Sequence, residues 1–324
     1  MALVNLYREC MQRGMEVELC STSFRVNDIR CFERAKIKKM AEVNIGEYDV
    51  LLAARSIFDY PIPISDIIGY HGLIVADNTT LYDGNDVYGD IVFTSGRNNY
   101  GTLIECGIAL PTVSTGCVKV NPNNVGKAST KKIVWIESGH FPYGKIGRQQ
   151  EADLIRQICL TYLDYEVVVK PRYLRSECTD VKHCNGDHLF YYLDEVKKET
   201  PNLTLLENAS SLGDVIADAE TVIHTYSSAF QEAVLLGKGI INIGDIYSEE
   251  TIDLRKNRWE RIKAYINRAE CTCNQADVLA HLPMGMRCSE QYKEYILGNE
   301  PTPVEAMIET IWIANEHWKK REML

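Results

Sequence analysis

Short apolar runs alternate with helical segments along most of the chain, and this alternation constrains the fold more than any other feature. The runs LLAA, IVWI, VVV and IINI contain almost no polar residue, so neither face of such a strand suits water. Strands that are apolar on both faces are typical of parallel sheets covered by helices on both sides. Strands are predicted at 17–20, 50–54, 67–70, 91–94, 112–114, 133–136, 166–170, 203–205, 221–224 and 240–243. Helices are predicted at about 3–11, 148–162, 186–198, 253–268 and 303–319.

The length of 324 residues exceeds what one hydrophobic core usually serves and predicts two domains. The polar stretch 115–132, rich in Gly, Asn and Lys, is typical of a linker. We therefore expect an N-terminal α/β domain at 1–118, a second α/β domain at 130–300, and a C-terminal helix at 301–324 that packs back toward the first domain. The chain begins with a helix, so the strand that normally opens such a first domain is absent from the pattern.

Charge and composition exclude several classes of protein. The net charge of -10 argues against a general nucleic-acid binder, which usually carries a basic face. No apolar run approaches the roughly 18 residues of a membrane span, and no signal peptide is evident, which favours the cytoplasm. Five of the 11 cysteines lie in otherwise apolar segments, and the cysteines are read as reduced buried thiols. Neither Cys271-Thr-Cys273 nor the Cys178…Cys184 cluster has paired zinc-ligand spacing, so no metal site is predicted.

A polar corner follows the predicted strand at 221–224, where His-Thr-Tyr-Ser-Ser leads into a short helix. Ser227 or Ser228 is suited to cap that helix, and a helix start also attracts anions such as a diphosphate. In an open parallel sheet, ligands bind beyond the carboxyl ends of the strands. Glu232, about one turn into the helix, is placed to accept hydrogen bonds from ribose hydroxyls. A purely stabilising role for these residues is an equally good interpretation.

The segment 214–244 resembles the donor-binding half of GT-B-type transferases of bacterial surface carbohydrates. CDP-glycerol glycerophosphotransferases carry a similar Asp-Tyr-Ser-Ser stretch. Nucleotide-sugar glycosyltransferases and UDP-N-acetylglucosamine 2-epimerases carry a Ser-rich corner followed by Glu-Ala and Gly-Lys-Pro, whereas Gly239 replaces the proline here. The resemblance implies two Rossmann-like domains facing across a cleft. It also implies a donor site that contains Tyr226, Ser227, Ser228 and Glu232.

Three further stretches contribute expected site residues. In the glycerophosphotransferases a His-Gly pair after a strand supplies the base, which implies that His71 deprotonates the acceptor, although Leu-Ile replaces the usual Thr-Pro after it. The strand ending in Ser95 and Gly96 resembles the end of that family's first domain. Ser95 and Arg97 would then lie on the acceptor side, with Arg97 either holding an acidic acceptor or standing as a solvated charge.

The second domain supplies two more elements of the expected donor site. Gly139 lies in a glycine-containing loop after the strand at 133–136, and that loop can approach the donor or the acceptor. Lys170 and Arg172 follow the strand at 166–170, where cations can neutralise a diphosphate. The related families have Lys-x-His-Pro at this point. The histidine is missing here, and Arg172, His183 or His188 would take its role.

The residues together with the resemblance imply a transferase of surface-polysaccharide synthesis that moves a glycosyl or glycerophosphate group from a nucleotide-activated donor to a carbohydrate or polyol acceptor. No Asp-x-Asp motif is present, so no metal or other cofactor is expected. Peripheral membrane association through the acceptor, the oligomeric state and the donor nucleotide stay open. Two alternatives also stay open, an enzyme similar to UDP-N-acetylglucosamine 2-epimerase and a non-catalytic nucleotide-sugar-binding protein.

Overall fold

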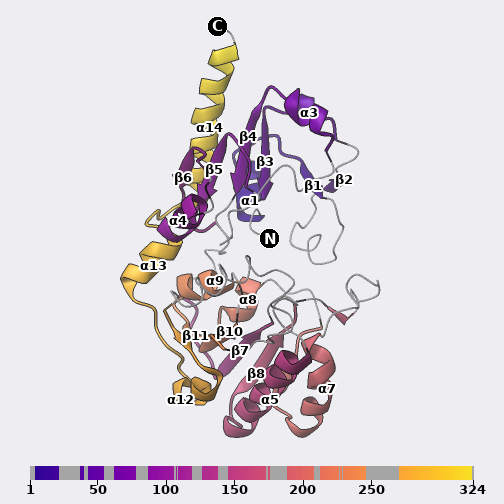
Figure 1. Ribbon diagram of the computed structural model, residues 1–324, viewed down its shortest axis with the longest axis vertical. Coiled ribbons are helices and arrows are strands. Elements are labelled where there is room, and N and C mark those ends of the chain that lie inside the picture. Colours follow the sequence, from indigo (N-terminus) through magenta and orange to yellow (C-terminus); the bar gives the residue numbers. More distant parts are fainter. Residues whose placement is uncertain are drawn as a thin grey trace. The chain divides into compact units, whose positions relative to one another are not determined.

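The computed structural model of the chain contains two compact units. The first comprises residues 1–120 and 291–324, and the second comprises residues 121–290. The structure describes residues 4–21, 37–39, 43–54, 62–77, 87–105, 107, 109–118, 126–137, 145–172, 174–175, 188–207, 212–225, 227, 229–245 and 270–322. Figure 1 labels the helices and strands of both units.

A parallel sheet forms the centre of the first unit. Its strands lie in the order β3 (Val50–Ala54), β4 (Leu73–Asp77), β5 (Ile91–Thr94) and β6 (Thr112–Ser114). A separate parallel pair consists of β1 (Leu19–Ser21) and β2 (Ile37–Lys39). The helix α1 (Val4–Gln12) precedes all the described strands and ends at Gly14, whose positive φ of 71° suits glycine.

Helices cover both faces of this sheet because its strands bury their side chains on both sides. Leu73, Val75 and Phe93 pack with α1 and with α14 (Pro303–Glu322), which contributes Met307 and Ile308. The alternate strand residues pack on the opposite face against α3 (Ile64–Ile68) and α4 (Arg97–Glu105). The C-terminal helix is therefore part of the core of the first unit (Figure 1).

The helix α13 (Glu290–Leu297) is joined to the end of β5 in the same unit. Ser95 Oγ donates a hydrogen bond to the carbonyl oxygen of Ile296, at 2.8 Å. Gly298 turns the chain beside Ser95 with a φ of 77°, and a Cβ at this position would lie 2.2 Å from the Ser95 carbonyl oxygen. The hydrogen bond of Ser95 and this close backbone approach join residues 291–300 to the first unit, whereas the predicted boundary placed them in the second domain.

A six-stranded parallel sheet forms the centre of the second unit. Its order is β12 (Thr272–Cys273), β11 (Gly239–Ile243), β10 (Thr221–His224), β7 (Lys132–Ile136), β8 (Glu166–Lys170) and β9 (Leu203–Leu205). From β7 the chain builds outward through β8 and β9, and then returns to the other side of β7 to build β10, β11 and β12. The topological switch point therefore lies between β7 and β10, where open α/β sheets bind ligands beyond the carboxyl ends of the strands.

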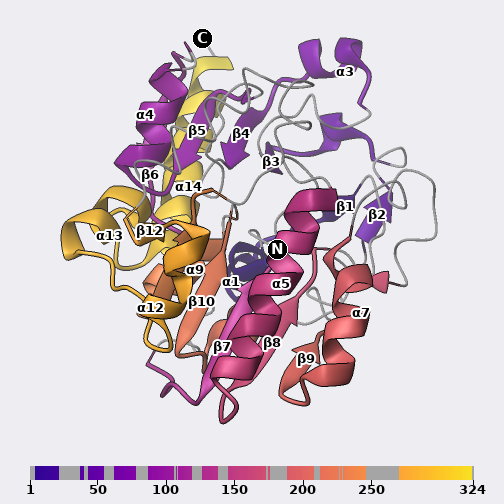
Figure 2. The ribbon, with the colours of Figure 1, turned by 60° about the horizontal axis from the view of Figure 1, so that its bottom comes forward.

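Helices also cover the sheet of the second unit (Figure 2). The helices α5 (Lys145–Thr161) and α7 (Leu189–Glu199) pack on the face that carries Ile133, Trp135, Val167 and Val169. The short helix α12 (Val278–His281) joins the same core through Val278. Alternate strand residues such as Val134 and Val168 are buried as well, and α9 (Ala229–Leu235) contacts β10 and β11, while α8 (Leu212–Ile216) contacts α9.

The predicted fold class is confirmed, since both units are parallel-sheet α/β structures. The strand predicted at 67–70 is wrong, because that segment forms α3 and the strand β4 begins only at Leu73. Pro63 is the N-cap of this helix and Gly69 is its C-cap, and Gly72 separates the helix from β4. The helix predicted at 253–268 lies outside the described residues.

Candidate functional site

The candidate site is the carboxyl edge of the second sheet at its switch point. The register pairs His224 of β10 with Ile136 of β7, and Ile136 with Lys170 of β8. The segments that follow these three adjacent strands therefore leave the sheet side by side. The structure thus brings the corner after β10 near Lys170, two features that the sequence analysis had assigned to one donor site.

Ser227 lies two residues before α9, the short helix that follows β10. Its Oγ accepts a hydrogen bond from the amide of Ala229 at 3.3 Å, and its carbonyl oxygen accepts one from the amide of Phe230, also at 3.3 Å. This geometry supports the capping role expected of a serine. Since Oγ is the acceptor in this bond, the hydroxyl hydrogen can still be donated, for example to a phosphate oxygen. Tyr226 and Ser228 lie outside the described residues.

His224 ends β10 and belongs to the core. It is almost fully buried, and its ring stacks on Phe230 with centroids 5.8 Å apart and planes 19° from parallel. Desolvation lowers the pKa of His224 to about 3, so the imidazole is neutral at physiological pH. Glu232 is also buried, at 8% exposed, within the first turn of α9. The corner therefore consists of the buried side chains of His224 and Glu232 and the partly exposed side chain of Ser227.

Lys170 and Arg172 follow β8 at the same edge. Lys170 is half-buried, and its Nζ lies 3.5 Å from the carbonyl oxygen of Pro171. The side chain of Arg172 is exposed, while its backbone amide donates to Glu137 Oε2 at 2.7 Å. The backbone of this cationic segment is therefore held by an acidic side chain that follows the central strand β7. Gly139, two residues further along from Glu137, lies outside the described residues.

A buried ionic cluster, which was not predicted from the sequence, lies next to this edge. Glu137 Oε1 accepts a hydrogen bond from the amide of Leu189, at the start of α7, at 3.0 Å. It also lies 3.4 Å from Nη2 of Arg148, and Nη1 of Arg148 contacts the carboxylate of Glu151. All three charged side chains are 0% exposed. Glu137 thus joins the start of α7, the exit of β8 and the helix α5.

The charge balance of this cluster is uneven, since one guanidinium faces two carboxylates. Burial raises the pKa of Glu151 above its ordinary value, and the positive charge of Arg148 opposes that rise. A sequence signal for the cluster exists. Glu137 directly follows an apolar strand, and Arg148 and Glu151 lie three residues apart on one helix, which places them as neighbours. Nothing local in the sequence, however, shows that these positions are buried.

The expected base, His71, lies at the opposite end of its strand from the one predicted. It precedes β4, so it stands at the amino edge of the first sheet. Its side chain is exposed, and its carbonyl oxygen accepts a hydrogen bond from Trp318 Nε1 at 2.7 Å. The role of a base was predicted for a histidine that follows a strand, whereas the carboxyl end of β4 is at Asp77, six residues after His71.

Ser95 and Arg97, expected on the acceptor side, do follow a strand of the first sheet. Ser95 is fully buried, and its hydroxyl is engaged with Ile296. This position is explained by packing against α13. Arg97 begins α4 with an exposed side chain, and within the described part of the chain no ion pair to it is found. Of these two residues, Arg97 is the one whose side chain is accessible to a ligand.

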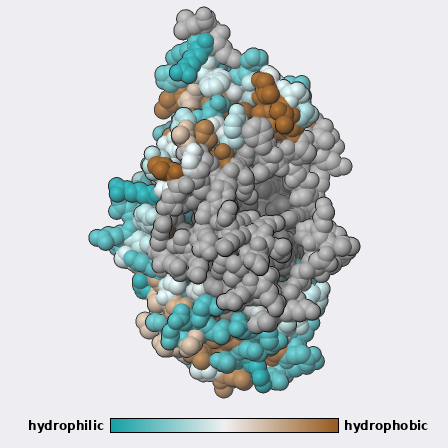
Figure 3. All heavy atoms as spheres, in the orientation of Figure 1, coloured by the Kyte–Doolittle hydropathy of each residue, from teal (hydrophilic) through white to brown (hydrophobic). Residues whose placement is uncertain are grey.

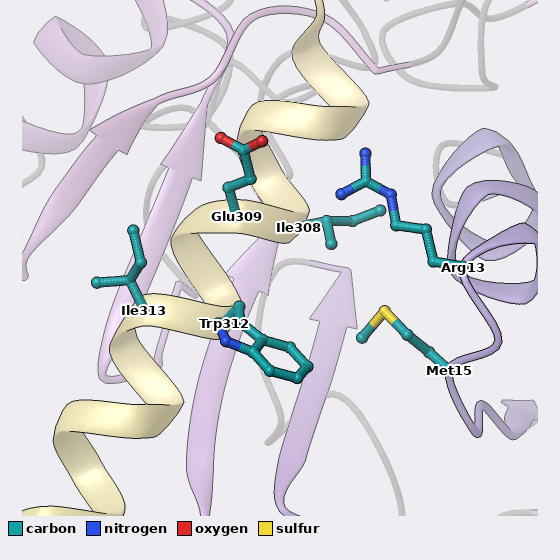
Figure 4. A pocket seen from close by; sticks show the side chains of 6 residues that line it. All are labelled: Arg13, Met15, Ile308, Glu309, Trp312 and Ile313. Carbon is teal, nitrogen blue, oxygen red and sulfur yellow. The ribbon is translucent and has the colours of Figure 1, made fainter.

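Two pockets among the described residues lie beside helices and do not coincide with the strand edges. One, of about 290 Å³, is lined by the segment that follows α1 and by α14, and Figure 4 shows Met15 and Trp312 facing it from these two segments. Arg13 beside it forms an ion pair with Glu9 at 2.8 Å. The other, of about 360 Å³, is lined mainly by polar residues of α5 and of the segment 275–279. Neither pocket contains a residue predicted for the site.

Exposed apolar side chains lie on several helices of the first unit, among them α3 and α4. Ile64 and Ile68 on α3 are 65% and 79% exposed, and Tyr100 and Ile104 on α4 are 47% and 55% exposed. Figure 3 shows hydrophobic surface at the positions of both helices.

None of the helices in the described part of the chain has the length and apolar character needed to cross a membrane. Within the same residues, no group of three or more His, Cys, Asp or Glu side chains is arranged to hold a metal ion.

No protein-family model matches the sequence, and no curated protein matches it. Solved structures do. A putative UDP-N-acetylglucosamine 2-epimerase from Listeria monocytogenes has a TM-score of 0.60 at 11% identity, covering 95% of this chain and 91% of that one. S. aureus MnaA, in a structure with UDP, has a TM-score of 0.60 at 13% identity, covering 96% and 92%. The wall teichoic acid polymerase TagF has a TM-score of 0.57 at 11% identity, covering 98% and 86%.

This chain has a GT-B-like fold. The likeness covers nearly the whole chain, both units included. At 11–13% identity it establishes the fold alone, and the activity has to be argued from the site.

Proposed function

We propose that this chain is a nucleotide-sugar enzyme whose second unit binds a nucleoside diphosphate-linked donor at the switch point between β7 and β10. The observation that carries the proposal is the position of Ser227, which follows β10 at the edge where open parallel sheets bind ligands. The fold likeness supports it, because S. aureus MnaA, a protein of similar fold, was solved with UDP.

The residues at this edge have the chemistry that a diphosphate needs. The hydroxyl of Ser227 can donate to a phosphate oxygen. Lys170 and Arg172 supply positive charge from the neighbouring segment, which stabilises the charge that develops on a departing nucleotide. Glu232 is assigned to the ribose, as the sequence resemblance implies. Tyr226, Ser228 and Gly139 complete the proposed donor site.

Two reactions fit such a site. In a transferase, an acceptor hydroxyl attacks the donor and displaces the nucleotide, and the likeness to a teichoic acid polymerase favours this reaction. In a UDP-N-acetylglucosamine 2-epimerase-like enzyme, the donor sugar itself is rearranged, and the likeness to several such epimerases favours that reaction equally. We propose transfer to a carbohydrate or polyol hydroxyl, with Arg97 toward the acceptor, and keep epimerisation as the second candidate.

Binding is tested first, by thermal shift and titration calorimetry with UDP, GDP, CDP and CMP. A ligand that binds only the folded chain raises its melting temperature by mass action, so at least one nucleotide should do so. Ser227→Ala should weaken the affinity for that nucleotide about tenfold, which corresponds to about 1.4 kcal/mol for one lost hydrogen bond to a charged group. Ser65→Ala is the matched control, since Ser65 is an exposed serine of α3 and should leave the affinity unchanged.

Turnover then separates the two reactions. A nucleotide sugar that binds is incubated with and without candidate acceptors, and free nucleotide and free sugar are followed by chromatography. Nucleotide release that depends on an acceptor supports transfer. Rearranged or free sugar formed without an acceptor supports epimerisation. If none of the four nucleotides binds, the proposed function is abandoned.

A further inference from the structure

Two cysteines of the second unit lie almost in bonding contact, away from the candidate site. The Sγ atoms of Cys271 and Cys288 are 3.2 Å apart, although the residues are 17 positions apart in the chain. Both are thiols in this structure. Cys271 directly precedes the edge strand β12, and Cys288 lies three residues before the point at which the chain returns to the first unit.

The backbone on each side of the thiols is held in place. The neighbours of the two cysteines are joined, because the carboxylate of Glu270 accepts hydrogen bonds from the amide and the hydroxyl of Ser289, at 2.6 and 2.7 Å. Both segments also bond to β11. The carbonyl oxygen of Cys271 accepts from the amide of Asn242 at 2.8 Å, and Met286 exchanges two backbone hydrogen bonds with Ile240, at 2.8 and 3.0 Å. The thiols therefore face each other because of the fold around them.

Little movement separates this arrangement from a covalent bond. A disulfide has an S–S distance of about 2.05 Å, so the sulfur atoms have to approach by about 1.2 Å, which small side-chain rotations can supply. Cys271 also has a φ of 61°, in the left-handed region that residues other than glycine rarely adopt. The backbone is therefore in an unfavourable conformation at Cys271, one of the two cysteines.

We propose that Cys271 and Cys288 are a modification site, at which a small-molecule disulfide of the glutathione type oxidises the pair to an intramolecular disulfide. Cys288 is half-buried and Cys271 is 9% exposed, so Cys288 meets the oxidant first. The hydrogen bond with Cys288, burial and the charge of Glu270 all raise the pKa of Cys271, which keeps this thiol protonated until the second step.

The reaction is a two-step thiol–disulfide exchange. The Cys288 thiolate attacks one sulfur of the oxidant, forming a mixed disulfide and breaking the oxidant's S–S bond, and the first small thiol leaves and takes up a proton. Cys271 then loses its proton to solvent and attacks the sulfur of Cys288, which releases the second small thiol. The two protein thiols are oxidised by two electrons, and the oxidant is reduced to two thiols.

The test uses the full chain in buffers of graded reduced-to-oxidised glutathione ratio, followed by alkylation, trypsin digestion and mass spectrometry. Cleavage after Arg268, Arg287 and Lys293 places the cysteines on separate peptides, 269–287 and 288–293. The expected product is one cross-linked pair of these peptides, with the intact chain lighter by two hydrogens. Oxidation should also raise the melting temperature, since the bond closes a loop of the unfolded chain.

Variants identify the sulfur atoms involved. Cys288→Ser and Cys271→Ser should each abolish the cross-link, and Cys271→Ser should accumulate a glutathione adduct on Cys288. Cys273→Ser is the control that should keep the cross-link, because Cys273 packs against the hydrophobic core of α5 and α7. The proposal is overturned if no ratio of glutathione yields the cross-link, or if the cross-link of the unmodified chain joins Cys273 to Cys288.

Discussion

Arg148 is the side chain whose removal should destabilise the second unit most through charge alone. It is 0% exposed and is paired with two buried carboxylates, those of Glu137 and Glu151. Arg148→Met keeps most of the side-chain volume and leaves both carboxylates without their counter-charge. Breaking a buried pair in this way typically costs about 3–5 kcal/mol. That is a large part of the roughly 5–15 kcal/mol by which a domain is stable.

The matched control lies on the same helix. Arg156 forms an ion pair with Glu199, but the two side chains are 47% and 55% exposed. Because water solvates these charges whether or not they are paired, Arg156→Met should cost at most about 1 kcal/mol. Urea unfolding measures the free energy of unfolding of each variant. Hydrogen exchange of peptides from β7 and α5 assigns the loss to the second unit, because it reports local stability where a chain of two units need not unfold in one transition.

The pH dependence supplies a second readout. Burial raises the pKa of Glu151 in the folded chain, so the folded state binds its proton more tightly than the unfolded state does. The stability that Glu151 contributes is therefore present below its ordinary pKa. It is lost as the pH rises through the pKa that Glu151 has in the folded chain. Without Arg148 the pKa rises further, so the deficit of Arg148→Met should be smaller at about pH 5 than at about pH 8. Equal stability of the two arginine variants, or a deficit independent of pH, would refute this account of the cluster.

Two further predictions concern the first unit. Gly298→Ala should cost about 1–3 kcal/mol in urea unfolding, because its Cβ would lie 2.2 Å from the Ser95 carbonyl oxygen and its φ is 77°. Gly101→Ala, in the helix α4 with nothing within 4 Å of the added Cβ, should be neutral or stabilise by up to about 1 kcal/mol; equal losses at both glycines would contradict the close-contact argument. His71→Ala should leave the turnover of any nucleotide sugar found to react unchanged, because His71 stands at the amino edge of its sheet; a loss of two or more orders of magnitude would restore it as the base.

The prediction succeeded where the signal was local. The strands β3, β5, β8 and β10 have the predicted bounds because a short apolar run between polar turns is a property of consecutive residues. The strand predicted at 67–70 is wrong for the same reason. The apolar stretch around it covers the helix α3, two glycines and the strand β4, and hydrophobicity alone does not separate them.

What only the tertiary structure decided is which segments meet. Strand order is set by packing between distant segments, and the order β10, β7, β8 places Ser227 and Lys170 at one edge with Glu137 between their segments. The same packing buries Arg148 and brings Cys271 to Cys288. Residue types and local periodicity determined the elements and the α/β class of this protein. Which residues are buried and which of them are in contact depends on the free energy of the whole core. No short stretch of sequence determines that free energy.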